Sequence, residues 1–216
     1  MIEVLKESWS EFLVRFKVLF MATLPWILSV IVLRGIASTL SDSISYFIFF
    51  LISVVELILQ AMIAFAGLQV LFKNRGAKVE VTSGKIITYI IAVTYIEIAT
   101  MLGMFFIILG FIIMAASFFA PIYIFKEHQG PIEAVASSAS LLQGKVLHVT
   151  LLLCGVWLAI YAVKYVASLI FGLLPAPDLL ATTIISALLL VVDLVTLPVM
   201  VNLHTYLVAE HNKQIQ

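Results

Sequence analysis

Four ionisable residues lie inside apolar stretches of the sequence, and they are the groups that could carry chemistry: Glu56, Glu97, Lys164 and Asp193. A charge in hydrocarbon is costly, so such residues face the interior of a helix bundle, find partners, and often mark ion or proton pathways. The sequence therefore predicts an intramembrane polar cluster. Two roles are open for this cluster: a proton or ion relay, or a structural device that fixes the register of the helices.

No catalytic or metal-binding motif accompanies these charges. The sequence lacks His-Glu-x-x-His, Walker and Gly-x-Ser-x-Gly patterns, and its single cysteine, Cys154, excludes a disulfide framework within the chain. We therefore expect no enzyme activity, no cofactor and no bound metal. If the chain were a lipid-processing enzyme, its acid–base groups would be Glu127, His128 and Glu133, beside the cytoplasmic membrane surface.

The composition is that of a membrane protein. Of the 216 residues, 63% are hydrophobic and 11% are charged, and the mean hydropathy is +1.20. Soluble domains have about 45–50% apolar and about 25% charged residues. These values exclude a cytosolic enzyme, a nucleic-acid-binding domain and a disordered chain. Twelve basic residues balance twelve acidic ones, so the expected partners are membrane lipids and other membrane proteins, with no nucleic acid.

Apolar runs identify the helices that must position the buried charges. The run at 86–125 would measure about 60 Å as one helix, twice the thickness of the hydrocarbon core, so we expect a turn at Gly103. Pro25 and Pro198 lie inside the first and last runs and are expected to kink them. The prediction is an all-α polytopic protein with six transmembrane helices, at about 18–40, 44–72, 86–102, 104–125, 146–174 and 179–208.

The distribution of basic residues predicts the orientation. Arg34 is the only lysine or arginine assigned to the outer side, and Lys164 lies within a span. Because cytoplasmic loops are enriched in lysine and arginine, both termini are expected in the cytoplasm of a bacterial inner membrane. The N-terminus has mixed charges and is expected to be retained rather than cleaved. The ten basic residues on the cytoplasmic side are Lys6, Arg15, Lys17, Lys73, Arg75, Lys78, Lys85, Lys126, Lys145 and Lys213.

Two short amphipathic helices are expected at the cytoplasmic surface, at 1–17 and 131–143. For residues 1–17, an extension of the first span packed on the bundle is the alternative. The second helix begins at Gly130-Pro131 and ends at Gly144. Its serines, Ser137, Ser138 and Ser140, are expected on its polar face. Its expected apolar face comprises Ile132, Val135, Ala136, Ala139 and Leu142.

The segment between the fourth and fifth predicted spans resembles a known family pattern. A span ends in Pro121 and aromatic residues, and an acidic residue, a glycine and an Ala-x-x-x-Ser-x-x-Leu-x-x-Gly series follow. This pattern resembles the YciC-like family of uncharacterised bacterial inner-membrane proteins, and also the membrane domain attached to some glycerophosphodiester phosphodiesterases. The matching residues are Glu127, Gly130, Ala134, Ser138, Leu141 and Gly144; Val135 stands where the family usually has leucine.

The resemblance implies a six-helix inner-membrane protein without implying catalytic residues. The phosphodiesterase chemistry of the fused proteins resides in a separate soluble domain, and we do not expect it here. The favoured function is a non-enzymatic membrane component: an assembly partner, a lipid-environment factor or a regulator. The alternative is a small transporter or channel that uses Glu56, Asp193 and Lys164.

Overall fold

The computed structural model is all-helical throughout the residues that it describes, which are 2–40, 46–76, 82–103, 113–127, 129–172, 187, 190–191 and 193–215. The named helices are α1 (Ile2–Leu40), α2 (Tyr46–Asn74), α3 (Ser83–Gly103), α5 (Ala120–Glu127), α6 (Pro131–Leu141), α7 (Val146–Gly172) and α9 (Thr196–Ile215). Helix α1 lies along α2 and α9, and α3 lies against α2, α5 and α6.

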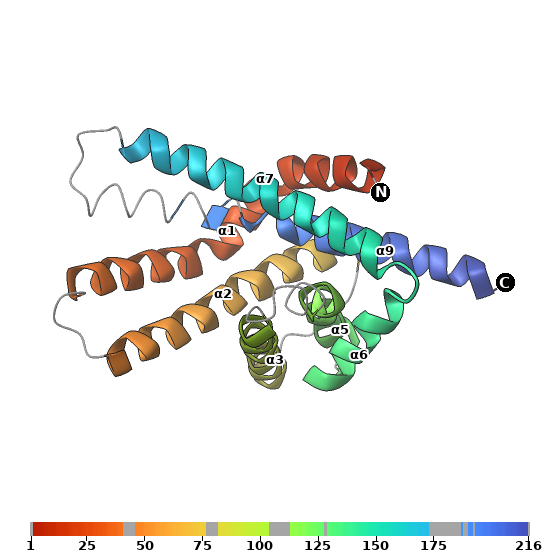
Figure 1. The fold of residues 1–216 in the computed structure, drawn as a ribbon, viewed down its shortest axis with the longest axis horizontal. Helices are drawn as coiled ribbons and strands as arrows, with labels where there is room; N and C mark the ends of the chain where they lie inside the picture. The colour runs from red at the N-terminus through yellow and green to blue at the C-terminus, as the bar shows by residue number, and fades with distance from the viewer. Residues whose placement is uncertain are drawn as a thin grey trace.

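Helices α1 and α2 run side by side as a long hairpin (Figure 1). The N-terminus of α1 and the C-terminus of α9 lie toward the same end of the bundle, away from the C-terminal end of α1 and the N-terminal end of α2. The boundary expected at residue 17 is absent, because α1 continues unbroken for 39 residues, or about 58 Å. Val4, Ser8 and Phe12 are buried, so the N-terminal part of α1 packs on the bundle, as the alternative interpretation of this segment requires.

The third apolar run contributes two helices that pack against each other. Helix α3 is described as far as Gly103 and contacts α5, and the turn expected at Gly103 falls where the described residues stop. The second half of this run differs from the single helix expected at 104–125, because a turn at Phe118–Phe119 separates residues 113–117 from α5. Pro121 lies in the first turn of α5. N–H groups in the first turn of a helix have no acceptor within that helix, so a proline there costs no hydrogen bond. Residues 104–112 lie outside the described part of the chain.

A similar interruption divides the region expected to form the last span, at 179–208. A turn at Leu194–Val195 precedes α9, and Pro198 occupies the first helical turn. Pro198 therefore begins a helix rather than kinking one. Helix α9 then continues to Ile215, beyond the expected boundary. Residues 179–186, where the last span was expected to begin, lie outside the described part of the chain.

The core between α2, α3 and α5 is rich in aromatic side chains. The ring of Phe65 packs edge-on against Tyr89 and Phe125, with centroid distances of 5.2 Å in both pairs. Phe72 stacks on Phe125 at 5.6 Å. Such offset and edge-to-face pairs add stability beyond the area they bury, and they hold the two halves of the third apolar run against α2.

The outer surface of the bundle is apolar, above all on α7. Only Val149 and Leu153 are buried among the described side chains of that helix, and Leu158 is 70% exposed. Large exposed apolar surfaces mark contact with lipid or with other proteins.

Three stretches of the described helices are long and apolar enough to cross a membrane: Ile2–Ala37, Phe50–Asn74 and Val146–Ala167. The stretch Ser83–Ile96 is apolar but shorter.

Candidate functional site

Glu56 on α2 forms a salt bridge with an arginine of α1 that the sequence predicts to lie on the outer side of the membrane. The Arg34 guanidinium of α1 forms a salt bridge with Glu56, in which Nε donates to Oε1 at 2.8 Å and Nη2 binds the same oxygen. One helical turn further, Gln60 Nε2 donates to this oxygen at 3.1 Å. Glu56 is thus paired with a cation, as a carboxylate within an apolar helix requires.

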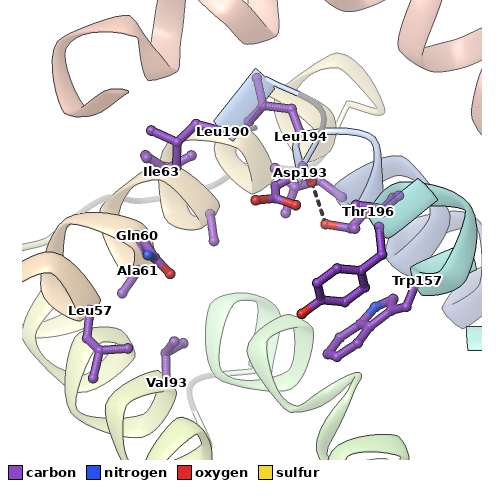
Figure 2. A pocket seen from close by; sticks show the side chains of 14 residues that line it. Leu57, Gln60, Ala61, Ile63, Val93, Trp157, Leu190, Asp193, Leu194 and Thr196 are labelled. Atoms are coloured by element: carbon purple, nitrogen blue, oxygen red, sulfur yellow. Dashed lines mark hydrogen bonds between the residues drawn. The ribbon is translucent and has the colours of Figure 1, made fainter. Parts of the chain in front are cut away.

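Gln60 also lines a cavity of about 300 Å³. Gln60 lines it from α2, Val93 from α3 and Trp157 from α7, while Asp193 and Thr196 line it where the chain enters α9 (Figure 2). The Thr196 hydroxyl donates to the main-chain carbonyl of Asp193 at 2.7 Å, which closes the turn before α9. Asp193 directly precedes this turn, and its side chain lines the cavity at the point where the chain enters α9.

Of the predicted polar cluster, the structure describes the side chains of Glu56 and Asp193. Gln60 bonds to Glu56 and, like Asp193, lines the cavity. The side chains of Glu97 and Lys164 fall outside the described residues. Arg34 was not predicted as the partner of Glu56. The sequence did carry a signal, because Arg34 near the end of α1 and Glu56 near the start of α2 lie within about one helical turn of the same height when residues are counted from those helix ends.

The family-like motif forms the docking face of α6. Ala134, Ser138 and Leu141 recur at helical spacing and are buried against the bundle. The Ser138 hydroxyl accepts a hydrogen bond from the main-chain N–H of Phe119 at 3.1 Å. Ser138 thereby satisfies a backbone donor at the turn before α5, which explains why a buried position carries a serine.

The apolar face predicted for this short helix was wrong in part. Ile132 is 76% exposed and Ala136 is exposed, whereas Ser138, expected on the polar face, is fully buried. Leu142 is buried, as expected. The residues that α6 turns inward, Ala134 and Ser138, are small, and small side chains let two helices approach closely.

Glycines limit α6 at both ends. Gly130 precedes Pro131 with an extended backbone, and its carbonyl accepts the N–H of Ala134 at 2.9 Å. Gly144 has φ +78°, a conformation that L-residues with a side chain adopt only at a cost. The chain can therefore leave α6 and turn into α7 within a few residues.

A second polar cluster joins α1, the end of α2 and α9. Arg75 Nη2 donates to Glu11 Oε2 at 2.7 Å and to Asn202 Oδ1 at 2.5 Å. Asn202 Nδ2 donates in turn to Glu11 at 2.9 Å and to the buried Ser8 hydroxyl at 3.2 Å. Arg15 also pairs with Glu11, one turn along α1. The cluster ties the N-terminal part of α1 to α9 and brings the predicted cytoplasmic cations of α1 and α2 together.

The groups named for a lipid-processing enzyme do not form a cluster in the described structure. Glu127 Oε2 accepts from Gln129 Nε2 at 3.1 Å, Glu133 is exposed on α6, and His128 lies outside the described residues. His204 is instead buried edge-on against the rings of Phe119 and Tyr123. Among the described residues, no three histidine, cysteine, aspartate or glutamate side chains stand close enough to hold a metal ion.

Comparisons with known proteins give no family for the chain: no family model, no curated protein and no solved structure matches it. The class that the fold defines is therefore an all-α protein with helices able to span a membrane.

Proposed function

We propose that the chain is a non-enzymatic component of a bacterial inner membrane, surrounded by lipid, with both termini in the cytoplasm. The proposal includes membership of the YciC-like family, on the motif from Glu127 to Gly144. It also includes six membrane crossings, with the described spans as three of them.

The observation that carries this proposal is the pairing of the half-buried charges between helices. Glu56 is bound by Arg34 and Gln60, and Glu11 is bound by Arg75, Arg15 and Asn202. Each carboxylate joins two or three helices. Carboxylates engaged in this way support a role in fixing the bundle rather than in passing protons, because a relay requires groups that exchange partners with water.

Reconstitution tests the proposal against the transporter alternative. Purified protein is placed in liposomes that contain a pH-sensitive dye, and proton, sodium and potassium gradients are imposed in turn. The proposal predicts fluxes equal to those of protein-free vesicles, both for the unmodified chain and for Glu56→Gln. A flux that the unmodified chain supports and Glu56→Gln abolishes would overturn the proposal and establish the relay.

The second candidate is a small transporter or channel, and the cavity favours it. Asp193 and Gln60 line this cavity together, and Gln60 touches the Glu56–Arg34 pair. A transported ion or solute could use these groups in sequence. In the same liposomes, this candidate predicts a gradient-driven flux that Asp193→Asn reduces and that Glu3→Gln, a change at an exposed position of α1, leaves unaltered.

A further inference from the structure

A surface cavity of about 360 Å³ lies between the N-terminal part of α1 and α9. Helix α1 supplies most of its wall, and α9 supplies one amide side chain. Among the described side chains that line it, one is basic and two are acidic, so a ligand in this cavity meets charges of both signs. The lining residues are Glu7, Ser10, Glu11, Val14, Arg15 and Asn202.

Arg15 provides the positive side of this cavity. Its Nε lies 3.3 Å from Glu11 Oε1, but its Nη1 has no hydrogen-bond partner among the described residues although it is shielded from solvent. Leaving a buried donor without an acceptor is costly, and a guanidinium group matches the oxygens of a phosphate. The Arg15 side chain as a whole is 25% exposed, so a ligand can reach it from the cavity.

The charges around Glu11 leave an excess of positive charge beside the cavity. One carboxylate, Glu11, is shared by the two guanidinium groups of Arg15 and Arg75. Within this group of three, one positive charge therefore has no carboxylate of its own. An anionic group of a ligand balances that charge.

Glu7 provides the negative side. Because Arg15 reaches back one turn to Glu11, its guanidinium lies about one further turn, or about 6 Å, from Glu7 along the helix. Glu7 and Ser10 are exposed, and both accept hydrogen bonds. The described lining holds no aromatic ring, whereas aromatic faces are what favour quaternary ammonium groups. The negative side therefore suits a primary ammonium group, which has N–H donors.

An exposed apolar stripe continues from the cavity along α1. Val14 is 80% exposed, and Val18 and Met21, which follow it at helical spacing, are also exposed. Between Val14 and Met21 the helix rises about 10 Å, which is less than half of a hydrocarbon core about 30 Å thick. A ligand whose charged head lies in the cavity thus finds an apolar surface for its tail within one leaflet.

We propose that this cavity binds the headgroup of a phospholipid that carries a primary ammonium group, as in phosphatidylethanolamine. The phosphate lies on Arg15, the ammonium group lies between Glu7 and Ser10, and the acyl chains follow the stripe that begins at Val14. The inference rests on the proposed insertion in a membrane, and it names the kind of lipid that the chain holds there.

Native mass spectrometry of the purified chain with an equimolar mixture of three phospholipids in detergent tests this assignment. The lipids have identical acyl chains and carry phosphoethanolamine, phosphocholine or phosphoglycerol headgroups. We expect phosphatidylethanolamine to occupy the chain about two- to fivefold more often than either of the others, the range that exposed ion pairs provide. Equal occupancy by the three lipids would overturn the proposal.

A soluble zwitterion is the other possible source of this chemistry. Glycerophosphoethanolamine, the same headgroup without acyl chains, is added in excess to the bound lipid. We expect it to leave the lipid in place, because it lacks the contacts along the apolar stripe. Displacement of the lipid would show that the cavity takes the soluble headgroup, and would contradict a phospholipid site.

Variants separate the charges from the volume of the site. Glu7→Gln should remove the preference for phosphatidylethanolamine, whereas Glu3→Gln, the same change one turn earlier at an exposed position outside the cavity, should keep it. Arg15→Met should lower the occupancy by all three lipids, since each has a phosphate. Ser10→Leu keeps both charges but fills the cavity, and it decides the matter if Arg15→Met does not fold. An unchanged preference in Glu7→Gln or in Ser10→Leu would contradict the proposal.

Incorporation of the chain into nanodiscs is measured separately, so that two failures can be told apart. A chain that enters nanodiscs but shows no preference among the three lipids contradicts the headgroup site alone. A chain that does not enter them contradicts the proposed membrane location itself.

Discussion

Ser138 of α6 accepts a hydrogen bond from the main-chain N–H of Phe119, nineteen residues earlier in the chain, at 3.1 Å. The contact is buried on both sides. It supplies a partner for a backbone donor at the turn where the chain breaks before α5, and it fixes α6 against the bundle. A residue of the family-like motif therefore has a definite structural role.

Ser138→Ala should destabilise the chain measurably. Removing the hydroxyl leaves the buried Phe119 N–H without an acceptor, which costs about 1–3 kcal/mol. Thermal unfolding in detergent, followed by circular dichroism, measures the effect. The matched control is Ser140→Ala, two residues away, because Ser140 is exposed and bonds only to the carbonyl of Ser137. Equal melting temperatures for the two variants would show that the hydrogen bond contributes nothing.

The Arg34–Glu56 pair should appear as a coupling energy in a double-mutant cycle. Arg34→Met and Glu56→Gln each leave the other group unpaired within an apolar region, whereas the double variant leaves no unpaired charge. We expect the double variant to lose less stability than the sum of the single variants, by about 0.5–3 kcal/mol. Thermal unfolding of the four proteins gives this value.

The control for that cycle pairs Glu56→Gln with Lys85→Met, because Lys85 lies at the start of α3, away from the Arg34 contact. These two changes should add to within about 0.5 kcal/mol. Strict additivity of the Arg34 and Glu56 changes would mean that the salt bridge holds no stabilising energy.

The contact between Lys145 and Glu210 predicts an acid-sensitive part of the stability. Lys145 Nζ lies 2.8 Å from Glu210 Oε2, and this hydrogen bond lowers the pKa of the Glu210 carboxyl below its usual value. A carboxyl with a lowered pKa in the folded state stabilises the fold above its unfolded pKa, and this contribution is lost as the pH falls through the folded pKa.

Lys145→Met should therefore lower the melting temperature at neutral pH and have little effect in acid. The measurement is the difference in melting temperature between the unmodified chain and the variant, followed from about pH 7 to about pH 3. The difference should shrink as Glu210 becomes protonated. Lys85→Met is the control, and its difference in melting temperature from the unmodified chain is not expected to shrink as the pH falls. A difference that stays constant with pH would exclude a role for the charged carboxylate.

Helix positions could be predicted from the sequence because length and hydropathy dominate them. The predicted ranges 44–72, 86–102 and 146–174 differ from α2, α3 and α7 by at most three residues at any end. The turn expected near Gly103 rests on a length argument, since a single helix over residues 86–125 would measure about 60 Å, twice the hydrocarbon thickness; the residues that follow Gly103 lie outside the described part of the chain.

The interruptions at Phe118 and Leu194 were not predicted, although a signal was present. Each turn comes two or more residues before a proline, Pro121 or Pro198, and each proline then lies in the first turn of the following helix. Proline is tolerated there and not in a helix interior. Treating Pro198 as a helix start rather than as a kink, and Pro121 as a helix start rather than as the end of a span, would have located both boundaries.

The partner of Glu56 could not be predicted from depth alone. Counting residues gives the height of a charge along a helix, but it gives neither the direction in which the side chain points nor the reach of a neighbour. Arg34 bridges the difference in height because its long side chain extends along the apolar helix surface. The inward face of α6 was missed because the large Ile132 points outward, whereas the small Ala134 and Ser138 pack inward.

Cysteine labelling in spheroplasts tests the central claim, a bundle inserted in the membrane with its basic segments on the cytoplasmic side. In a Cys154→Ser background, single cysteines are placed by Ser43→Cys, Lys78→Cys and Lys213→Cys, and a membrane-impermeant maleimide is added before or after the membranes are broken. The account predicts that position 43 is labelled in intact spheroplasts, and that positions 78 and 213 are labelled only after breakage. Labelling of position 78 or position 213 in intact spheroplasts would contradict it.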